Sequence, residues 1–292
     1  VQPREYKVVF SDKEVCQGIC VALGLPVPKH LGCVDPDEDV IEIIQAALVA
    51  SRSGQIVVKP VRGIGGRDVL MIQRGERGPE VLPGSGDAFP LDDLRLQERM
   101  ILQERVIQHP AMAAFYDKAV NTIRVETLLT RDRQVILLGT ALRFGRIGAR
   151  VDNLSAGGIG VGVEKESGAL MSLGRDFGGR TCERHPDTGV RFEGFHVPYW
   201  REVVALLHRA QRHFPYFRLL GFDIAIGVDG PVIIEINSIP DNAGLEAVQG
   251  PILSDPRVVT EFDRYGLLVN APTKALARRL RTAGAIRAGE KR

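Results

Sequence analysis

The sequence of 292 residues predicts an α+β protein in which antiparallel strands alternate with a few amphipathic helices. Residues 38–50 and 199–214 carry apolar side chains at helical spacing. Residues 55–72 and 219–237 hold β-branched runs separated by glycine-rich or Asp-Gly segments, a pattern typical of strands joined by turns. With 44% hydrophobic residues, the chain can bury the core of one large domain or of two to three lobes.

Residues 1–100 are expected to form the first lobe. Glycine and two prolines at 24–28 end its first helix, and an acidic first turn suits the dipole of its second. The glycine- and proline-rich residues 74–90 are typical of a surface excursion. The predicted elements are helices at 14–23 and 38–50 and strands at 55–60 and 69–72.

Residues 101–270 are expected to form a second, sheet-rich lobe. Its longest helical pattern is followed by two strand-like runs around an Asp-Gly turn. Residues 271–292 are basic and alanine-rich, which is typical of a helix that frays. The predicted elements of the second lobe are strands at 102–107, 122–130 and 134–144, a helix at 199–214 and a hairpin at 219–237.

Charge and cysteine content narrow the function classes. Basic and acidic residues nearly cancel, leaving a formal net charge of +2 and a pI near 8.4, so charge gives no reason to expect nucleic acid as a partner. The four cysteines form no CxxC pair and no metal-ligand spacing, which favours reduced thiols in a cytoplasmic protein. No apolar run approaches the ~20 residues that cross a bilayer, so we expect no transmembrane segment.

The strongest candidate site lies on the predicted hairpin at 219–237. Glu235 and Asn237 are two apart on one strand and therefore point to the same face. If the connection is the three residues 228–230, Asp223 lies opposite Glu235 on the partner strand. Three oxygen-bearing side chains on one rigid patch suit Mg²⁺. The alternative is a solvated polar face, but the apolar residues that alternate with these three favour the lining of a cleft.

A glycine-dense loop follows a lysine at the end of a buried-looking strand. Lys59 can place a point charge against a phosphate, and the backbone amides of Gly63, Gly65 and Gly66 can close over it. An ordinary hairpin turn is the alternative, because the loop is neither a Walker A sequence nor a GxGxxG that precedes a helix. Lys13 is a second candidate phosphate ligand, although a lone lysine at a helix start is more often solvated.

Residues 102–110 carry polar groups on a predicted strand. The side chain of Gln103 and the backbone around Val106 supply amide donors and acceptors of the kind that bind the edge of adenine. Glu104 and His109 are further candidate nucleotide contacts in the same segment. Taken alone, the segment is equally consistent with an ordinary strand.

Two further strands and the loop after them carry candidate catalytic residues. Arg124 and Arg143 can neutralise a transferring phosphoryl group if their strands face a cleft, whereas surface ion pairing is the more common use of an arginine. Asn153, which opens the run NLSAGG, is the third candidate.

In order along the chain, these motifs resemble the ATP-grasp superfamily over residues 11–250. The motifs are SDK, GLPVP, VVKP with GIGGRDV, QERVI, NTIR, an arginine before NLSAGG, GFD and EIN. The resemblance implies two α/β lobes whose antiparallel sheets grip ATP between them. It also implies that Lys13 and Lys59 contact phosphates, that residues 63–69 form a mobile loop, that Gln103 and Val106 form the adenine hinge, and that Asp223, Glu235 and Asn237 bind the metal.

Some motifs narrow the resemblance within the superfamily. NTIR, QHP and the Asp-Asn-Ala-Gly stretch followed by Gln249 are similar to the sugar-transfer-associated ATP-grasp group. More distantly, NLSAGG, the glycine before Phe-Asp and the GLE of EINSIPDNAGLE resemble the α-L-glutamate ligases. The SIPDNAG segment is longer than the usual Asn-x-x-Pro-Gly of the superfamily, so analogy does not assign the substrate.

The function that the resemblance implies is an ATP- and Mg²⁺-dependent carboxylate-amine ligase that works through an acyl phosphate. One or two Mg²⁺ ions are expected, with Mn²⁺ as a substitute, and the substrates are expected to be small or carrier-linked carboxylates and amines. Cell-surface polysaccharide or natural-product biosynthesis is the expected setting, and a homodimer is one expected assembly. The alternatives are a small-molecule kinase on the same scaffold and a nucleotide-binding module without turnover.

Overall fold

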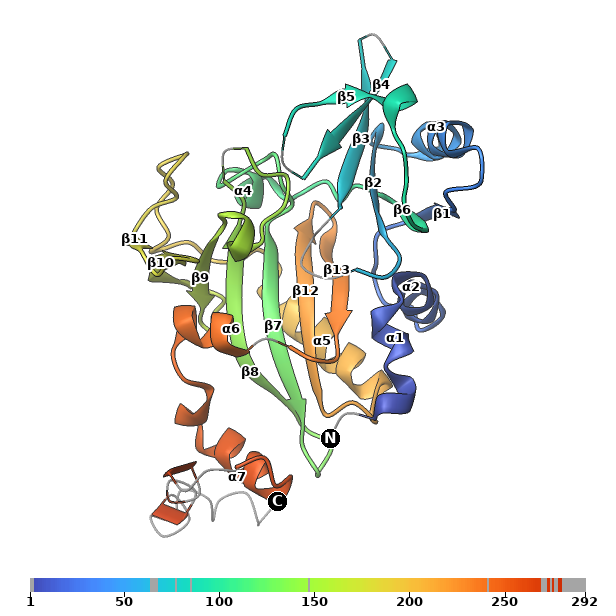
Figure 1. Ribbon diagram of the computed structural model, residues 1–292. Helices are drawn as coiled ribbons and strands as arrows, with labels where there is room; N and C mark the ends of the chain where they lie inside the picture. The colour runs from blue at the N-terminus through green and yellow to red at the C-terminus, as the bar shows by residue number, and fades with distance from the viewer. Residues whose placement is uncertain are drawn as a thin grey trace.

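A computed structural model describes residues 3–63, 68–76, 78–84, 86–146, 148–240 and 242–268, with 272, 273, 275, 278 and 279. It confirms the predicted α+β class, because two antiparallel sheets with a few helices make up the described parts of the chain (Figure 1). No helix among these residues is long and apolar enough to span a membrane. Of the basic tail, Lys274 and Arg281 lie outside the described residues.

The first sheet has six strands in the order β1-β6-β2-β3-β4-β5, all antiparallel to their neighbours. One helix, α3 (Val40–Ala50), begins at the N-cap Asp39 and packs its buried face against this sheet. Ile44 and Leu48 of α3 share a core with Ile56 and Val58. The strands are β1 (His30–Val34), β2 (Gln55–Pro60), β3 (Leu70–Gly75), β4 (Gly78–Pro83), β5 (Phe89–Pro90) and β6 (Met100–Glu104).

The second sheet has seven strands in the order β11-β10-β9-β8-β7-β12-β13. Helix α5 (Trp200–His213) covers part of it and contributes Val203 and Leu207 to a core that also holds Phe144 and Phe222. The strands are β7 (Thr122–Leu129), β8 (Val135–Phe144), β9 (Ile159–Val163), β10 (Leu170–Asp176), β11 (Thr181–Cys182), β12 (Leu219–Gly227) and β13 (Gly230–Asn237).

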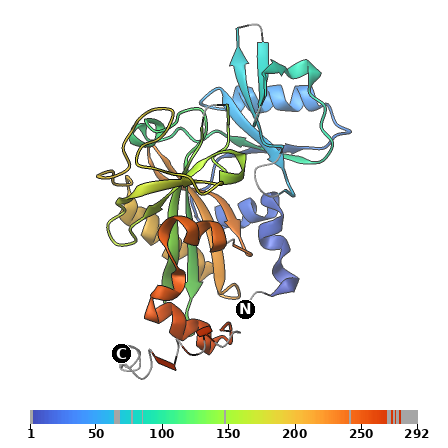
Figure 2. The same cartoon turned by 60° about the vertical axis from the view of Figure 1, so that its left-hand side comes forward.

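The two helices at the start of the chain pack on the second core. α1 (Val8–Ser11) and α2 (Lys13–Ala22) lie beside the β12-β13 hairpin in both views (Figures 1 and 2). The Phe10 ring meets the rings of Phe214 and Phe217 edge-on, at centroid distances of 5.0 and 4.7 Å. These helices thus join the second core, while β6 joins the first sheet; the expected division at residue 100 stays a prediction.

Helix α6 (Asn242–Gln249) follows β13, and hydrogen bonds of one of its side chains join it to β8. Gln249 accepts a hydrogen bond from the Thr140 N–H at 2.8 Å and donates to the Leu138 carbonyl at 3.3 Å. Gly139 between them permits this approach, because a Cβ there would lie 2.3 Å from the Gln249 amide nitrogen. The remaining short elements include α4 (Pro110–Ala113), a 3-10 turn at Leu154–Ala156 and α7 (Pro256–Arg264).

Candidate functional site

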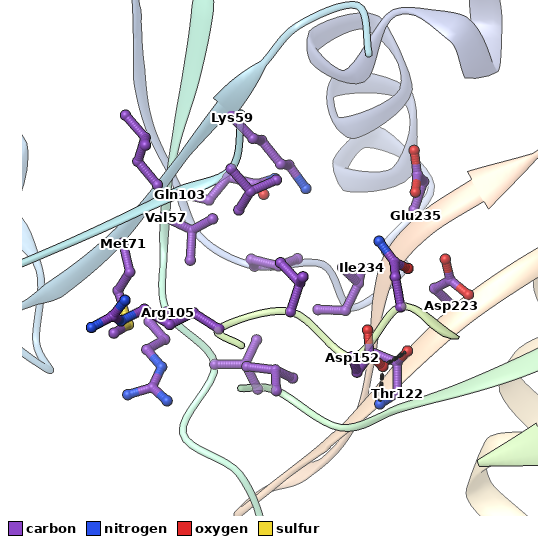
Figure 3. Close-up of a pocket in the computed structure, with 18 of the residues that line it drawn as sticks. Val57, Lys59, Met71, Gln103, Arg105, Thr122, Asp152, Asp223, Ile234 and Glu235 are labelled. Carbon is purple, nitrogen blue, oxygen red and sulfur yellow. Dashed lines mark hydrogen bonds between the residues drawn. The ribbon is translucent and has the colours of Figure 1, made fainter. Parts of the chain in front are cut away.

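A cavity lies between the two sheets and is lined from both (Figure 3). Val57 of β2 and Met71 of β3 form an apolar wall on the side of the first sheet, and Ile234 of β13 faces the cavity from the second. The polar end of the cavity holds Asp223 and Glu235. A concave site with apolar walls and a few convergent polar groups is typical of small-molecule binding.

The register of the β12-β13 hairpin brings the two carboxylates together. Gly227 pairs with Gly230, so the turn has two residues and not the predicted three. With that turn alone, Asp223 would face Ile234, but a β-bulge between Asp223 and Ile224 shifts the register by one and restores the pairing of Asp223 with Glu235. The predicted turn was wrong, while the predicted pairing is observed because the bulge compensates for it.

Two arginines on neighbouring strands reach the Asp223 carboxylate. Its Oδ1 lies 3.0 Å from Arg124 Nε and 2.9 Å from Arg143 Nη2. These are close ion pairs, yet Oδ1 is buried without a well-oriented hydrogen bond. The predicted catalytic arginines therefore meet the predicted metal ligand directly, although Arg124 is not among the residues that line the cavity.

The predicted metal-binding side chains have features that suit a hard divalent cation. Asp223 Oδ1 is buried without a hydrogen-bond partner, and such atoms are rare unless a ligand completes them. Carboxylate and amide oxygens are the ligands that Mg²⁺ prefers. No group of three or more His, Cys, Asp or Glu side chains within the described ranges could hold a metal, so the set depends on the Asn237 amide beside two carboxylates. Asn237 pairs with Gly221 and does not line the cavity.

Two lysines approach the same end of the cavity. Lys59, at the end of β2, is only 7% exposed, and burial lowers the pKa of its ammonium group to about 8 even though Glu235 lies nearby. Lys13 donates to the Gly63 carbonyl at 2.7 Å and lies 3.7 Å from Glu235 Oε1. Gly63 lines the cavity, whereas the predicted phosphate contacts Gly65 and Gly66 lie outside the described residues.

The structure brings only part of the predicted adenine-hinge segment to the cavity. Gln103 and Val106 line the cavity, and the Gln103 amide donates to Gln17 of α2. Glu104 also lines it, but its Oε1 accepts the backbone N–H groups of Arg52 at 2.6 Å and Ser53 at 3.2 Å, so this carboxylate holds the turn after α3.

His109 is not brought to the cavity. Its Nδ1 accepts the Ala111 N–H at 3.2 Å as the N-cap of α4, and its ring lies edge-on to Tyr199. His109 is therefore part of the support behind the hinge segment.

A buried aspartate that sequence reasoning missed supports Arg143. Asp152 Oδ2 accepts hydrogen bonds from the Thr122 N–H at 2.8 Å and from the Thr122 hydroxyl, and it lies 3.6 Å from Arg143 Nε. Thr122 Oγ1 in turn accepts from Arg143 Nη2 at 2.6 Å. Burial raises the pKa of Asp152 despite the nearby guanidinium. The only sequence signal for Asp152 was its position before Asn153, which itself lines the cavity.

Comparison with known proteins identifies the family. The family model described as "Sugar-transfer associated ATP-grasp" matches residues 1–258. No curated protein matches the sequence significantly.

Among solved structures, a D-cycloserine synthetase is 18% identical, with a TM-score of 0.49, and the match covers 96% of this chain and 73% of that one. An N5-carboxyaminoimidazole ribonucleotide synthetase from Thermotoga maritima is 13% identical, with a TM-score of 0.45 and coverage of 83% and 46%. An L-amino acid ligase from Bacillus licheniformis is 12% identical, with a TM-score of 0.47 and coverage of 81% and 42%.

The chain spans less than half the length of two of these three enzymes. At these identities and TM-scores the similarities do not extend to function. The family match covers most of the chain and agrees with the two-sheet architecture described above. The chain has the ATP-grasp fold and belongs to the sugar-transfer associated ATP-grasp family.

Proposed function

We propose that this protein is an ATP- and Mg²⁺-dependent carboxylate-amine ligase. One observation carries the proposal: Asp223, paired with Glu235 across the hairpin, is held by two arginines at the polar end of a cavity that also contains the buried Lys59. Buried charges of both signs are costly to maintain unless a charged ligand uses them. Membership of the ATP-grasp family supports a nucleotide triphosphate as that ligand.

The two ends of the cavity suggest how the nucleotide lies. Val57, Met71 and Ile234 offer apolar surfaces to the faces of a purine, and the backbone near Val106 offers amide groups to its edge. Lys13 and Lys59 are then close to the phosphates. Burial deprives the Lys59 ammonium group of solvation by water, so its charge is best compensated when a phosphate group reaches it.

Asp223, Glu235 and Asn237 are the residues that would hold Mg²⁺. The ion would neutralise negative charge on the β- and γ-phosphate oxygens and orient them. Arg124 and Arg143 share the charge of Asp223 in the nucleotide-free protein. A bound cation would free both guanidinium groups to contact anionic oxygens of the reacting groups.

In the proposed reaction, a carboxylate oxygen of the substrate attacks the γ-phosphorus and ADP leaves as the bond to the β-phosphate oxygen breaks. The amine nitrogen then attacks the acyl carbon, the carbon-oxygen bond to phosphate breaks, and the nitrogen loses a proton to give an amide and inorganic phosphate. Arg124 and Arg143 would offset the charge that develops in both steps, with Asn153 as a neutral donor beside them. No protein nucleophile takes part.

The substrate class remains a proposal that rests on the family. A carboxylate and an amine, either free or linked to a carrier of cell-surface polysaccharide or natural-product synthesis, fit its association with sugar transfer. A homodimer is likewise proposed as the assembly. The two synthetases and the L-amino acid ligase named above do not establish amide-forming chemistry for this chain.

Trapping the acyl phosphate tests the reaction type. The protein is incubated with Mg-ATP, hydroxylamine and panels of amino acids and sugar acids; a ligase gives a hydroxamate together with ADP. Glu235→Gln should abolish both products, whereas Glu202→Gln, an exposed glutamate on α5, should retain them. A stable phosphorylated product without hydroxamate would instead establish a kinase and contradict the proposal.

A further inference from the structure

A second cavity adjoins the first at the end opposite Asp223 and Glu235. Arg105, Lys118, Arg150 and Met71 line both cavities, and Figure 3 shows Arg105 and Met71 on the far side from the paired carboxylates. The second cavity is bounded by β2, β3 and β4 and by the loops at 116–118 and 148–150. It receives three cationic side chains, each from a different segment: Arg105, Lys118 and Arg150.

Among the residues that the structure describes, the hydrogen-bond acceptors of Arg105 are neutral. Its Nη1 donates to Gln55 Oε1 at 2.6 Å and its Nη2 donates to the Asp117 carbonyl at 2.9 Å. Burial lowers the pKa of this guanidinium, and the Asp117 carboxylate offsets only part of that effect. Its positive charge is thus incompletely compensated.

The described hydrogen-bond acceptors of Arg150 are neutral as well. Its Nη1 donates to the carbonyls of Pro83 at 3.0 Å and Gly86 at 3.2 Å, which are again neutral groups. In the described parts of the chain, no carboxylate lies within ion-pair distance of either Arg105 or Arg150. Lys118 lies 3.2 Å from Asp117, in a pair whose side chains are mostly exposed and therefore contribute little.

The charges in this cavity are therefore unbalanced. Three cations face one carboxylate, that of Asp117, which leaves a net charge of +2 among the lining residues. The amides of Gln55 and Gln73 also line the cavity and lie 3.2 Å from each other. Planar guanidinium forks match the paired oxygens of a phosphoryl group, and a lysine adds a point charge to it.

We propose that the second cavity, whose three cations also border the first, binds a phosphate-bearing small molecule that is distinct from the nucleotide. Its phosphoryl group lies among Arg105, Lys118 and Arg150, and its polar remainder contacts the two glutamine amides. Because the site is at the end away from Asp223 and Glu235, this ligand does not react there. The ligand bridges the first sheet to the loop that leads to Asp152. Arg150 of that loop already donates to the Pro83 carbonyl of the first sheet, so binding of the ligand is coupled to the order of the loop.

The test is calorimetric titration of inorganic phosphate into protein saturated with Mg²⁺ and a non-hydrolysable ATP analogue. Saturation fills the end of the first cavity that holds Lys13 and Lys59, so the remaining phosphate binding reports on Arg105, Lys118 and Arg150. We expect one phosphate to bind, and we expect Lys118→Gln and Arg150→Gln each to weaken it at least about tenfold, the loss of one charge-assisted hydrogen bond.

Arg95→Gln is the matched control. Arg95 also donates through Nη1 to two backbone carbonyls, those of Asp92 at 2.8 Å and Leu94 at 2.7 Å, but it does not line the cavity. Its variant should bind phosphate as the wild-type protein does. Lys118→Gln keeps the test sound if Arg150→Gln loosens its loop, because the Lys118 side chain is 71% exposed and its ammonium group pairs with the neighbouring Asp117.

Absence of phosphate binding to the saturated protein, or equal affinity in the Lys118→Gln and Arg95→Gln proteins, would overturn the proposal. Titration with sugar phosphates separates two supporting outcomes: tighter binding than inorganic phosphate identifies the phosphoryl group of a larger metabolite, and equal binding identifies the free anion. If the ATP analogue itself does not bind, the proposed function fails. The anion site is then tested with the same variants in nucleotide-free protein.

Discussion

The two ends of the first cavity are built in different ways. At the polar end, strand pairing fixes the direction of the side chains, and Asp223 meets Glu235 through the register of β12 and β13. At the hinge end, the chain leaves β6 at Glu104, and the side chains of Glu104 and His109 bond to the protein behind the hinge.

This difference indicates where side-chain identity matters. Where strand pairing fixes the direction of a side chain, no neighbouring side chain can take its place when it is replaced, so the chemistry changes. Along a hinge, the backbone makes the contacts, so most side chains there can change without changing nucleotide binding. Substitutions at the polar end should therefore have large effects on turnover, and those at the hinge should mainly affect stability.

The largest effect is expected for Asp223→Asn. Loss of this charge removes a metal ligand and leaves Arg124 and Arg143 without their anionic partner. Turnover of Mg-ATP should fall by about 10²–10³-fold, as for other preorganised electrostatic groups. Phosphate release measures it, and Asp229→Asn, at the exposed turn of the same hairpin, is the control that should keep full activity.

Lys59 should give nucleotide binding a pH dependence. Its pKa of about 8 means that the ammonium form, which attracts phosphate, predominates below pH 8 and is lost as the pH rises through that value. Affinity should be constant near pH 7 and fall by about tenfold per pH unit above 8. Binding titrations between pH 6.5 and about 9.5 measure this. Lys59→Gln should bind more weakly at pH 7 and show no such fall; a flat profile in the wild-type protein would remove Lys59 from the phosphate site.

A smaller effect is expected where Thr122 supports Arg143. Thr122→Val removes the hydroxyl that accepts from Arg143 at 2.6 Å, and hydrogen bonds to charged groups contribute about 1.5–3 kcal/mol. We expect kcat to fall about tenfold while nucleotide affinity changes little. Thr122→Ser keeps the hydroxyl and should restore kcat, which a purely structural defect would not allow.

The smallest effect on binding is expected at the hinge. His109→Ala removes an N-cap and Glu104→Gln weakens the acceptor of the turn after α3, so each should lower the free energy of unfolding by about 1 kcal/mol. Nucleotide affinity should change less than about threefold. Chemical denaturation and calorimetry measure the two quantities. A tenfold loss of affinity in His109→Ala would break the contrast between the two ends.

The sequence predicted the fold class and most of the polar end, because both follow from local patterns. Alternation and an Asp-Gly turn placed Asp223 and Glu235 on facing strands, yet the bulge between Asp223 and Ile224 that completes their pairing leaves no mark in the sequence. The helix starts at Asp12 and Asp39 are likewise local, since each aspartate accepts a backbone N–H three residues later.

The remaining features depend on contacts between distant segments. Asp152 reaches Thr122 across thirty positions of chain, and Phe10 packs on Phe214 and Phe217 although it precedes the first sheet. No periodicity encodes such pairs, because each residue alone suits many surroundings. The direction of the Glu104 side chain could not be predicted from the sequence for the same reason, because its partners are two backbone amides of the turn after α3.

The central claim is that Asp223 and Glu235 form a magnesium-nucleotide site between the two sheets. Calorimetric titration with a non-hydrolysable ATP analogue, with and without Mg²⁺, tests it most directly when wild-type and Asp223→Asn proteins are compared. We predict tight binding that depends on Mg²⁺ in the wild-type protein and is lost in the variant. Equal binding by both proteins, or binding that ignores Mg²⁺, would contradict the assignment.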